Sequence, residues 1–286
     1  MTLRSLVLLL PLIPLLTHCG GGGTSTRMPQ VINVSAYDPK ERQREGQSYS
    51  EHDVSALKAN GASALIARCG KGGVLDEKCA AFLASADREG MHVGAYYRLQ
   101  THVDAVAQAD QFVSRMQAIA RGRSWNADKI LLAGDFDANS RLSDITRFVD
   151  RIEARTGSPP VVYLENSEHM RVMLSQADSA TKAKLRRCPY WAALYSCESG
   201  ACKSFPAPET PKGLVSQYAV WHDWSLWQYA GVDWEKGRSN PKCYTHPTFR
   251  SGPYFGNLDR PVERNVFNGS HGELASFWGN HGISTR

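Results

Sequence analysis

The chain has 286 residues, of which 42% are hydrophobic, and this is enough for one large domain or two small ones. Its 33 Lys and Arg residues against 28 Asp and Glu residues give a formal net charge of +5. The basic residues are scattered rather than clustered, so the sequence does not predict a nucleic-acid groove. We expect a monomer without nucleic acid, metal or cofactor.

The N-terminus predicts export. Arg4 precedes an apolar run over residues 5–17 that is too short and too rich in proline for a comfortable membrane span. We expect a signal peptide over residues 1–19 and a flexible, glycine-rich linker over residues 20–28. Residues 16–19 (LTHC) resemble a bacterial lipobox, so Cys19 is the expected lipidation site and membrane anchor; plain cleavage near Cys19 is the alternative. The expected location is the periplasm or the cell envelope.

Six cysteines remain besides Cys19, and an even number in an exported chain indicates three disulfide bonds. The expected pairs are Cys69–Cys79, Cys197–Cys202 and Cys188–Cys243. The alternative is a zinc site that combines the late cysteines with His222 or His246, although no CxxC pair supports it.

Apolar runs typical of buried strands alternate with amphipathic or Ala-rich segments typical of helices. The predicted strands and helices alternate in chain order over residues 28–35, 51–60, 62–69, 77–88, 91–97, 104–120, 130–135, 144–155, 160–164 and 167–185. Three further strands are predicted over residues 190–195, 226–229 and 262–267, with links that look like loops. A last helix begins at Ser270, where Glu273 completes a capping box.

Eight strands, of which the first five are each followed by a helix, indicate an α/β fold with a parallel sheet closed as a barrel. An open, doubly wound sheet is the alternative architecture. In a barrel, the chemistry lies at the carboxyl ends of the strands.

Two aspartates end the apolar run of residues 130–134 (ILLAG). Because strand side chains alternate between faces, Asp135 and Asp137 are expected to point the same way, with Phe136 opposite. Like charges this close push their pKa values apart, and one protonated acid beside one ionised acid is what cleavage of a glycosidic bond needs. The alternative is one aspartate that caps the next helix and one that makes the turn before it.

Aromatic residues also fall at the predicted strand ends, and aromatic rings stack on the apolar faces of sugars. The expected substrate-binding residues are Arg68, Tyr96, Tyr97, Tyr163, Tyr195, Trp227 and Tyr229. Core packing is the alternative for each ring taken alone. Glu165 also falls at a strand end, where the sequence assigns it no role.

An ordered series of motifs runs through the chain. Residues 31–35 (VINVS), 93–98 (VGAYYR), 134–137 (GDFD) and 262–269 (VERNVFNG) are similar to G-I-D-V-S, G-A-Y-H-F, L-D-x-E and V-D-x-N-x-F-N-G. In this order the motifs resemble those of the family 25 glycoside hydrolases, the lysozymes of the Chalaropsis and cellosyl type. The resemblance implies a modified TIM-type (β/α)5(β)3 barrel over residues 29–286 that hydrolyses the β-1,4 bond of peptidoglycan.

Three carboxylates of the family pattern are changed. The family's first Asp is Asn33, its catalytic Glu is Asp137, and its late Asp is Glu263, unless an insertion makes Asp259 the equivalent. The resemblance implies that Asp137 protonates the leaving oxygen, while Asp135 stabilises the oxocarbenium-like centre or orients the 2-acetamido group. Asn33 and Glu263 would tune these two. The missing methylene moves the carboxyl group by roughly 1 Å, which can cost about a hundredfold in rate.

Three functions are consistent with these features. The first is an exported muramidase, and the second is a catalytically impaired, glycan-binding lipoprotein of the same fold. The third is a barrel enzyme for another sugar or cell-surface polymer, with the changed carboxylates fitted to that substrate. Asp233 and Glu235, in a predicted loop, are a rival carboxylate pair.

Overall fold

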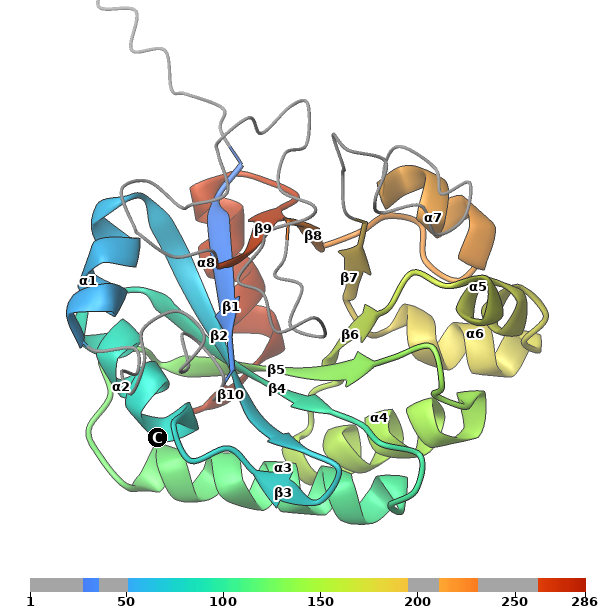
Figure 1. Cartoon of the computed structure of the whole chain (residues 1–286), viewed down its shortest axis with the longest axis horizontal. Coiled ribbons are helices and arrows are strands. Elements are labelled where there is room, and N and C mark those ends of the chain that lie inside the picture. Colours follow the sequence, from blue (N-terminus) through green and yellow to red (C-terminus); the bar gives the residue numbers. More distant parts are fainter. Residues whose placement is uncertain (1–27, 36–50, 195–210, 231–261) are drawn as a thin grey trace, which may run out of the picture.

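The computed structural model of the chain describes residues 28–35, 51–194, 211–230 and 262–286. Eight strands close into a barrel, since β1 (Gln30–Val34) pairs with β2 (Ala62–Lys71) on one side and with β9 (Glu263–Phe267) on the other (Figure 1). Between β2 and β9 the barrel continues through β4 (His92–Arg98), β5 (Lys129–Phe136), β6 (Val161–Leu164), β7 (Tyr190–Ala193) and β8 (Leu226–Ala230). The expected closed barrel is confirmed. The expectation of a wholly parallel sheet is wrong for β9, which runs antiparallel to both of its neighbours.

Helices surround the barrel (Figure 1). They are α1 (Glu51–Ala59), α2 (Cys79–Arg88), α3 (Ala105–Arg121), α4 (Leu142–Thr156), α5 (Glu168–Ser175), α6 (Ser179–Arg186) and α7 (Pro211–Tyr218). The single helix predicted over residues 167–185 is in fact two, because the side chain of Asp178 accepts the backbone N–H of Thr181 and starts a new helix. The link between β7 and β8 contains α7, which corrects the loop expected there.

The last helix, α8 (His271–His281), begins with the predicted capping box, in which Ser270 and Glu273 each accept the other's backbone N–H. Two short strands are unexpected. β3 (Val74–Leu75) pairs with the end of β2, and β10 (Gly282–Ser284) pairs with the start of β5.

Side chains at alternate strand positions form an inner cluster that fills the barrel. Its members are Val31, Ala64, Ile66, Tyr96, Leu131, Ala133, Val161, Trp191, Leu226 and Phe267 from the strands, with Leu274 and Trp278 from α8. The indole N–H of Trp278 donates to the carbonyl of Val93 (2.7 Å), so α8 is tied to the amino-terminal end of β4. Because apolar side chains occupy this end of the barrel, the polar side chains of the inner face lie towards the carboxyl ends of the strands.

A second, larger set of apolar residues packs between the strands and the surrounding helices; we call it the outer cluster. It contains Cys69 and Cys79, which form the predicted disulfide between β2 and the start of α2. It also contains Cys188, which is a free, buried thiol, so its predicted bond to Cys243 is wrong. Burial raises the pKa of this thiol to about 12, and it therefore stays protonated at neutral pH.

Some expectations fall outside the described residues: the signal peptide, Cys19, the linker and the Cys197–Cys202 pair. No helix in the described part of the chain is both long enough and apolar enough to span a bilayer.

Candidate active site

Asp135 lies on the inner face of β5, in step with Leu131 and Ala133 of the inner cluster. Its side chain is buried, with 8% exposure, and burial raises the pKa of its carboxyl group to about 6. The guanidinium of Arg98 opposes this rise, while the charges of Asp137 and Glu165 add to it. Asp135 is therefore a carboxyl group that can be held neutral or ionised near physiological pH.

Arg98 sits at the centre of these charges. It is the register partner of Asp135 across the β4–β5 pair, and its Nη2 lies 3.4 Å from Oδ2 of Asp137. Asp135 is the largest cause of a raised pKa for Arg98, with Asp137 and Glu165 adding to it, so the guanidinium stays charged. The positive charge of Arg98 thus interacts with three carboxylates, those of Asp135, Asp137 and Glu165.

Asp137 follows β5, and the backbone around it turns towards α4. Its Oδ1 accepts the N–H of Asn139 (3.0 Å), and its carbonyl accepts the N–H of Ser140 (2.9 Å). Its Oδ2 faces Arg98 and Gln100 Nε2, the latter at 3.5 Å. The turn-forming role that the sequence left as an alternative therefore holds for Asp137. Asp135 does not cap the following helix, because the N-cap residue of α4 is Arg141.

Glu165 follows β6 two residues after Tyr163, whose register partner is Asp135. Its backbone N–H donates to the carbonyl of Phe136 (3.0 Å), which fixes it beside the end of β5. Its exposed side chain accepts the N–H of Ala138 at Oε2 (3.2 Å). Glu165 is thus a third carboxylate of this cluster. The available signal in the sequence was its even spacing from Tyr163.

Asn33 and Glu263 face each other across the β1–β9 pair, and the amide of Asn33 donates to Oε2 of Glu263. Gln228 Nε2 donates to Asn33 Oδ1 (2.9 Å) and to Glu263 Oε2 (3.3 Å), and Asn265 Nδ2 donates to Asn33 Oδ1 (2.8 Å). The phenol of Tyr163 donates to Gln228 Oε1 (2.7 Å). Asn33 and Glu263, which both differ from the family pattern, are therefore compatible with each other. The neutral amide of Asn33 donates a hydrogen bond to Glu263, whereas a carboxylate at position 33 would repel it.

Two of the predicted aromatic residues lie on the inner face. Tyr96 and Tyr163 both meet Trp191 edge to face, with ring centroids 6.4 and 5.1 Å apart. Trp191 is almost fully buried, and its indole N–H donates to Asn265 Oδ1 (2.7 Å). The sequence analysis did not identify Trp191 as a site residue, although its position in β7 directs its side chain to the inner face of the barrel.

The predicted sugar-binding role is wrong for three aromatic residues, because their side chains point away from the barrel interior. Tyr97, Trp227 and Tyr229 belong to the outer cluster. Their polar atoms donate to neighbouring elements: Tyr97 to Gln111 (2.8 Å), Trp227 to the carbonyl of Leu194 (2.9 Å) and Tyr229 to Gln30 (2.8 Å). The alternative of core packing is correct for these three.

Arg68 is on the inner face, where its guanidinium forms a buried ion pair with Asp76 (2.7 Å) and its charge lowers the pKa of Asp135 slightly. Tyr195, Asp233, Glu235 and Asp259 lie outside the described residues.

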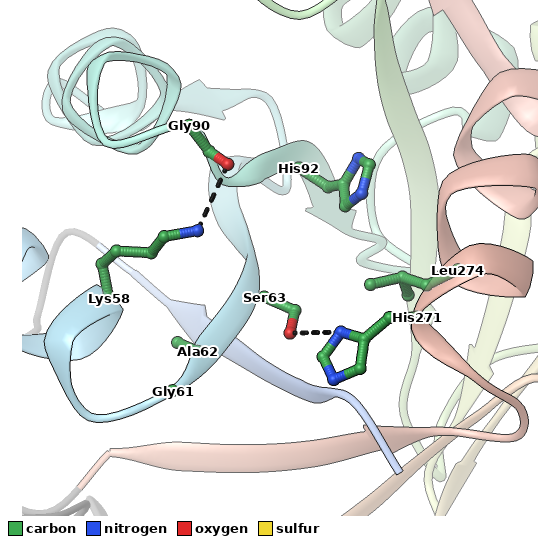
Figure 2. Close-up of a pocket in the computed structure, with 8 residues that line it drawn as sticks. All are labelled: Lys58, Gly61, Ala62, Ser63, Gly90, His92, His271 and Leu274. Atoms are coloured by element: carbon green, nitrogen blue, oxygen red, sulfur yellow. Dashed lines mark hydrogen bonds between the residues drawn. The ribbon is translucent and has the colours of Figure 1, made fainter. Parts of the chain in front are cut away.

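A cavity of about 350 Å³ lies at the opposite end of the barrel (Figure 2). It is lined by Lys58, Gly61, Ala62, Ser63, Gly90, His92, His271 and Leu274. None of these residues carries a carboxylate, so this cavity cannot supply the acid that glycosidic cleavage needs. Within the described ranges, no group of three or more His, Cys, Asp or Glu side chains could hold a metal ion.

Solved structures support the fold. A bacterial lysozyme from Streptomyces coelicolor matches with a TM-score of 0.58 and 21% identity, over 90% of this chain and 99% of that chain. A muramidase from Acremonium alcalophilum matches with a TM-score of 0.52 and 18% identity, over 87% and 97%. A family 25 glycosyl hydrolase from Bacillus anthracis matches with a TM-score of 0.54 and 16% identity, over 87% and 93%. At these identities the likeness shows the fold.

No curated protein matches the chain in sequence. The profile of the family described as Glycosyl hydrolases family 25 matches residues 45–237, which is more than half of the chain. The chain therefore belongs to family 25 of the glycosyl hydrolases.

Proposed function

We propose that this glycoside hydrolase acts as a muramidase that cleaves the β-1,4 bond of peptidoglycan. The observation that carries the proposal is a buried carboxyl group, Asp135, whose pKa is raised to about 6 beside two further carboxylates at the carboxyl end of the barrel. The family membership and the lysozyme and muramidase among the similar structures support peptidoglycan as the substrate.

Asp135 would act as the buried anion. Once ionised, it can stabilise the positive charge that develops at the anomeric carbon, or orient the 2-acetamido group that attacks this carbon. Burial increases the effect of its charge, because few water molecules screen it. Arg98 keeps the ionised form accessible at neutral pH.

Asp137 and Glu165 are more exposed than Asp135. The family resemblance assigns proton donation to Asp137. Asn33 and Glu263 would tune the site through their hydrogen bond, which leaves them neighbours of the reacting pair rather than participants.

The glycan would bind over Tyr96 and Tyr163, with Arg68 and Tyr195 also proposed as contacts. Tyr163 is the half-buried one of the two inner tyrosines, so its ring is available to an apolar sugar face. We further propose an exported monomer, held in the cell envelope by a lipid at Cys19.

A catalytically impaired, glycan-binding protein is the second candidate. The observation that favours it is the engagement of Asp137 in the turn before α4. Binding to glycan strands without any release of reducing ends would support this candidate against the first.

The test is the release of reducing ends from purified peptidoglycan by the mature chain. We expect Asp135→Asn to lower the rate by about a hundredfold or more, because the change removes the charge and keeps the shape. Asp223→Asn is the matched control, since Asp223 is exposed and outside the carboxylate cluster. Background release by the unaltered chain would overturn the proposed activity, and equal rates for the chain and Asp135→Asn would overturn the role of Asp135.

A further inference from the structure

We propose that Glu165, rather than Asp137, is the residue that donates the proton to the leaving oxygen. This inference rests on the proposed glycosidase function and names a further catalytic residue for it. It follows from what the two carboxylates contact.

Both carboxylate oxygens of Asp137 are engaged by neighbouring protein groups. One of its oxygens closes a turn with the N–H of Asn139, and the other faces Arg98 and Gln100. Its side chain is only 13% exposed. A proton on Asp137 would interrupt the contact with Arg98 or the turn, so proton transfer there works against the local structure.

Glu165 extends from the end of the neighbouring strand. Its side chain is exposed, and it carries the extra methylene that Asp137 lacks. Only Oε2 accepts a hydrogen bond from the described residues, through the N–H of Ala138. That contact places the carboxyl group beside the Asp137 turn while its second oxygen remains available to a glycan.

Electrostatics place Glu165 in the same reacting group. Its charge acts on Arg98 and on Asp135, as the charge of Asp137 does. The carboxylate of Glu165 therefore belongs to the same charged cluster as Arg98 and Asp135. The register agrees, because Asp135 pairs with Tyr163 and Glu165 stands two residues beyond on the same face.

The chemistry balances with one water molecule. The carboxyl group of Glu165 gives its proton to the glycosidic oxygen as the bond from the anomeric carbon to that oxygen breaks, and the bonding electron pair stays on the oxygen. The carboxylate that results takes a proton from water as the water oxygen bonds to the anomeric carbon. Glu165 ends the cycle protonated again, and the glycan has gained one water.

The experiment compares Glu165→Gln, Asp137→Asn and the control Glu168→Gln, which alters an exposed glutamate three residues away. Each variant is assayed on peptidoglycan and on an aryl glycoside whose 4-nitrophenolate leaves without protonation. We expect Glu165→Gln to lose about a hundredfold or more on peptidoglycan and less than about tenfold on the aryl glycoside.

Asp137→Asn should lose less than Glu165→Gln on peptidoglycan and about equally on both substrates, as a positioning residue would. The selective loss appearing in Asp137→Asn instead would overturn the proposal and leave the glycosidase function standing. Equal losses on both substrates for Glu165→Gln would also overturn it. An inactive unaltered chain would refute the function itself, which separates the two failures.

Discussion

Two polar regions occupy the inner face of the same barrel. One is a cluster of charged groups, and the other is a network of hydrogen-bonded amide groups. Around Arg98, three carboxylates share one cation, and burial holds the pKa of Asp135 up. Around Asn33, amide groups and Glu263 complete one another's hydrogen bonds. The carboxylate cluster is thus left with charge that a substrate can use, whereas the amide network is held fixed. The difference assigns chemistry to the first region and rigidity to the second.

Changing Asn33 to Asp should have the largest effect on stability, because it turns the fixed region into a charged one. A second carboxylate would stand against Glu263 in a site where Asn33 is 3% exposed. We expect Asn33→Asp to lower the free energy of unfolding by about 2–4 kcal/mol at pH 7. Urea denaturation measures this loss, and adding Glu263→Gln should recover most of it. A single variant as stable as the unaltered chain would show that the amide network is not the rigid region we describe.

Asp135→Asn should increase the stability of the fold, whereas Asn33→Asp should decrease it. The pKa of Asp135 is raised from 3.8 to about 6, so the folded chain binds more protons than the unfolded chain between these values and loses stability as the pH rises through them. We expect Asp135→Asn to raise the free energy of unfolding by about 1–3 kcal/mol above pH 6. The gain should shrink as the pH falls towards 3.8 and vanish below about pH 3, where Asp135 is neutral in both states. A gain that is the same at pH 3.5 and pH 7 would contradict the electrostatic origin.

Tyr163 connects the two regions, since its phenol donates to Gln228 and its register partner across the β5–β6 pair is Asp135. Removing the hydroxyl by Tyr163→Phe should cost about 1 kcal/mol of stability, the usual value for one hydrogen bond. Because burial sets the pKa of Asp135, that pKa should not move. Thermal unfolding and a pH titration of the variant check both parts, and a shift of the Asp135 pKa would show that the two regions are coupled.

The barrel was predictable from the sequence because its signals are local. Apolar strand runs, the Ala-rich segment that becomes α2 and the capping box at Ser270 all report on neighbouring residues. The break between α5 and α6 and the helix α7 were harder. Asp178 stops one amphipathic pattern only to start another, and α7 contains both proline and glycine.

The candidate site was predictable only where strand parity was respected. Asp135 and Tyr163 stand on the inner face, while Tyr97, Trp227 and Tyr229 are one residue out of step with it. A one-residue difference moves a side chain to the other face of the sheet, which is why Gln228, between two aromatic residues, points to the inner face of β8.

Long-range contacts were beyond the sequence. Nothing local to Cys188 indicates that packing between strands and helices seals it as a free thiol. The hydrogen bond between Glu165 and Ala138 likewise exists only because β5 and β6 are neighbours in the barrel.

The pKa of Asp135 is the quantity on which the proposed chemistry depends most directly. Carbon-detected NMR can follow the side-chain carboxyl resonances of the folded chain as the pH is changed, with Asp135→Asn identifying the signal. A midpoint of about 6 is expected, because burial outweighs the attraction of Arg98. A midpoint at or below the ordinary aspartate value of 3.8 would contradict a buried, reactive carboxyl group at the end of β5.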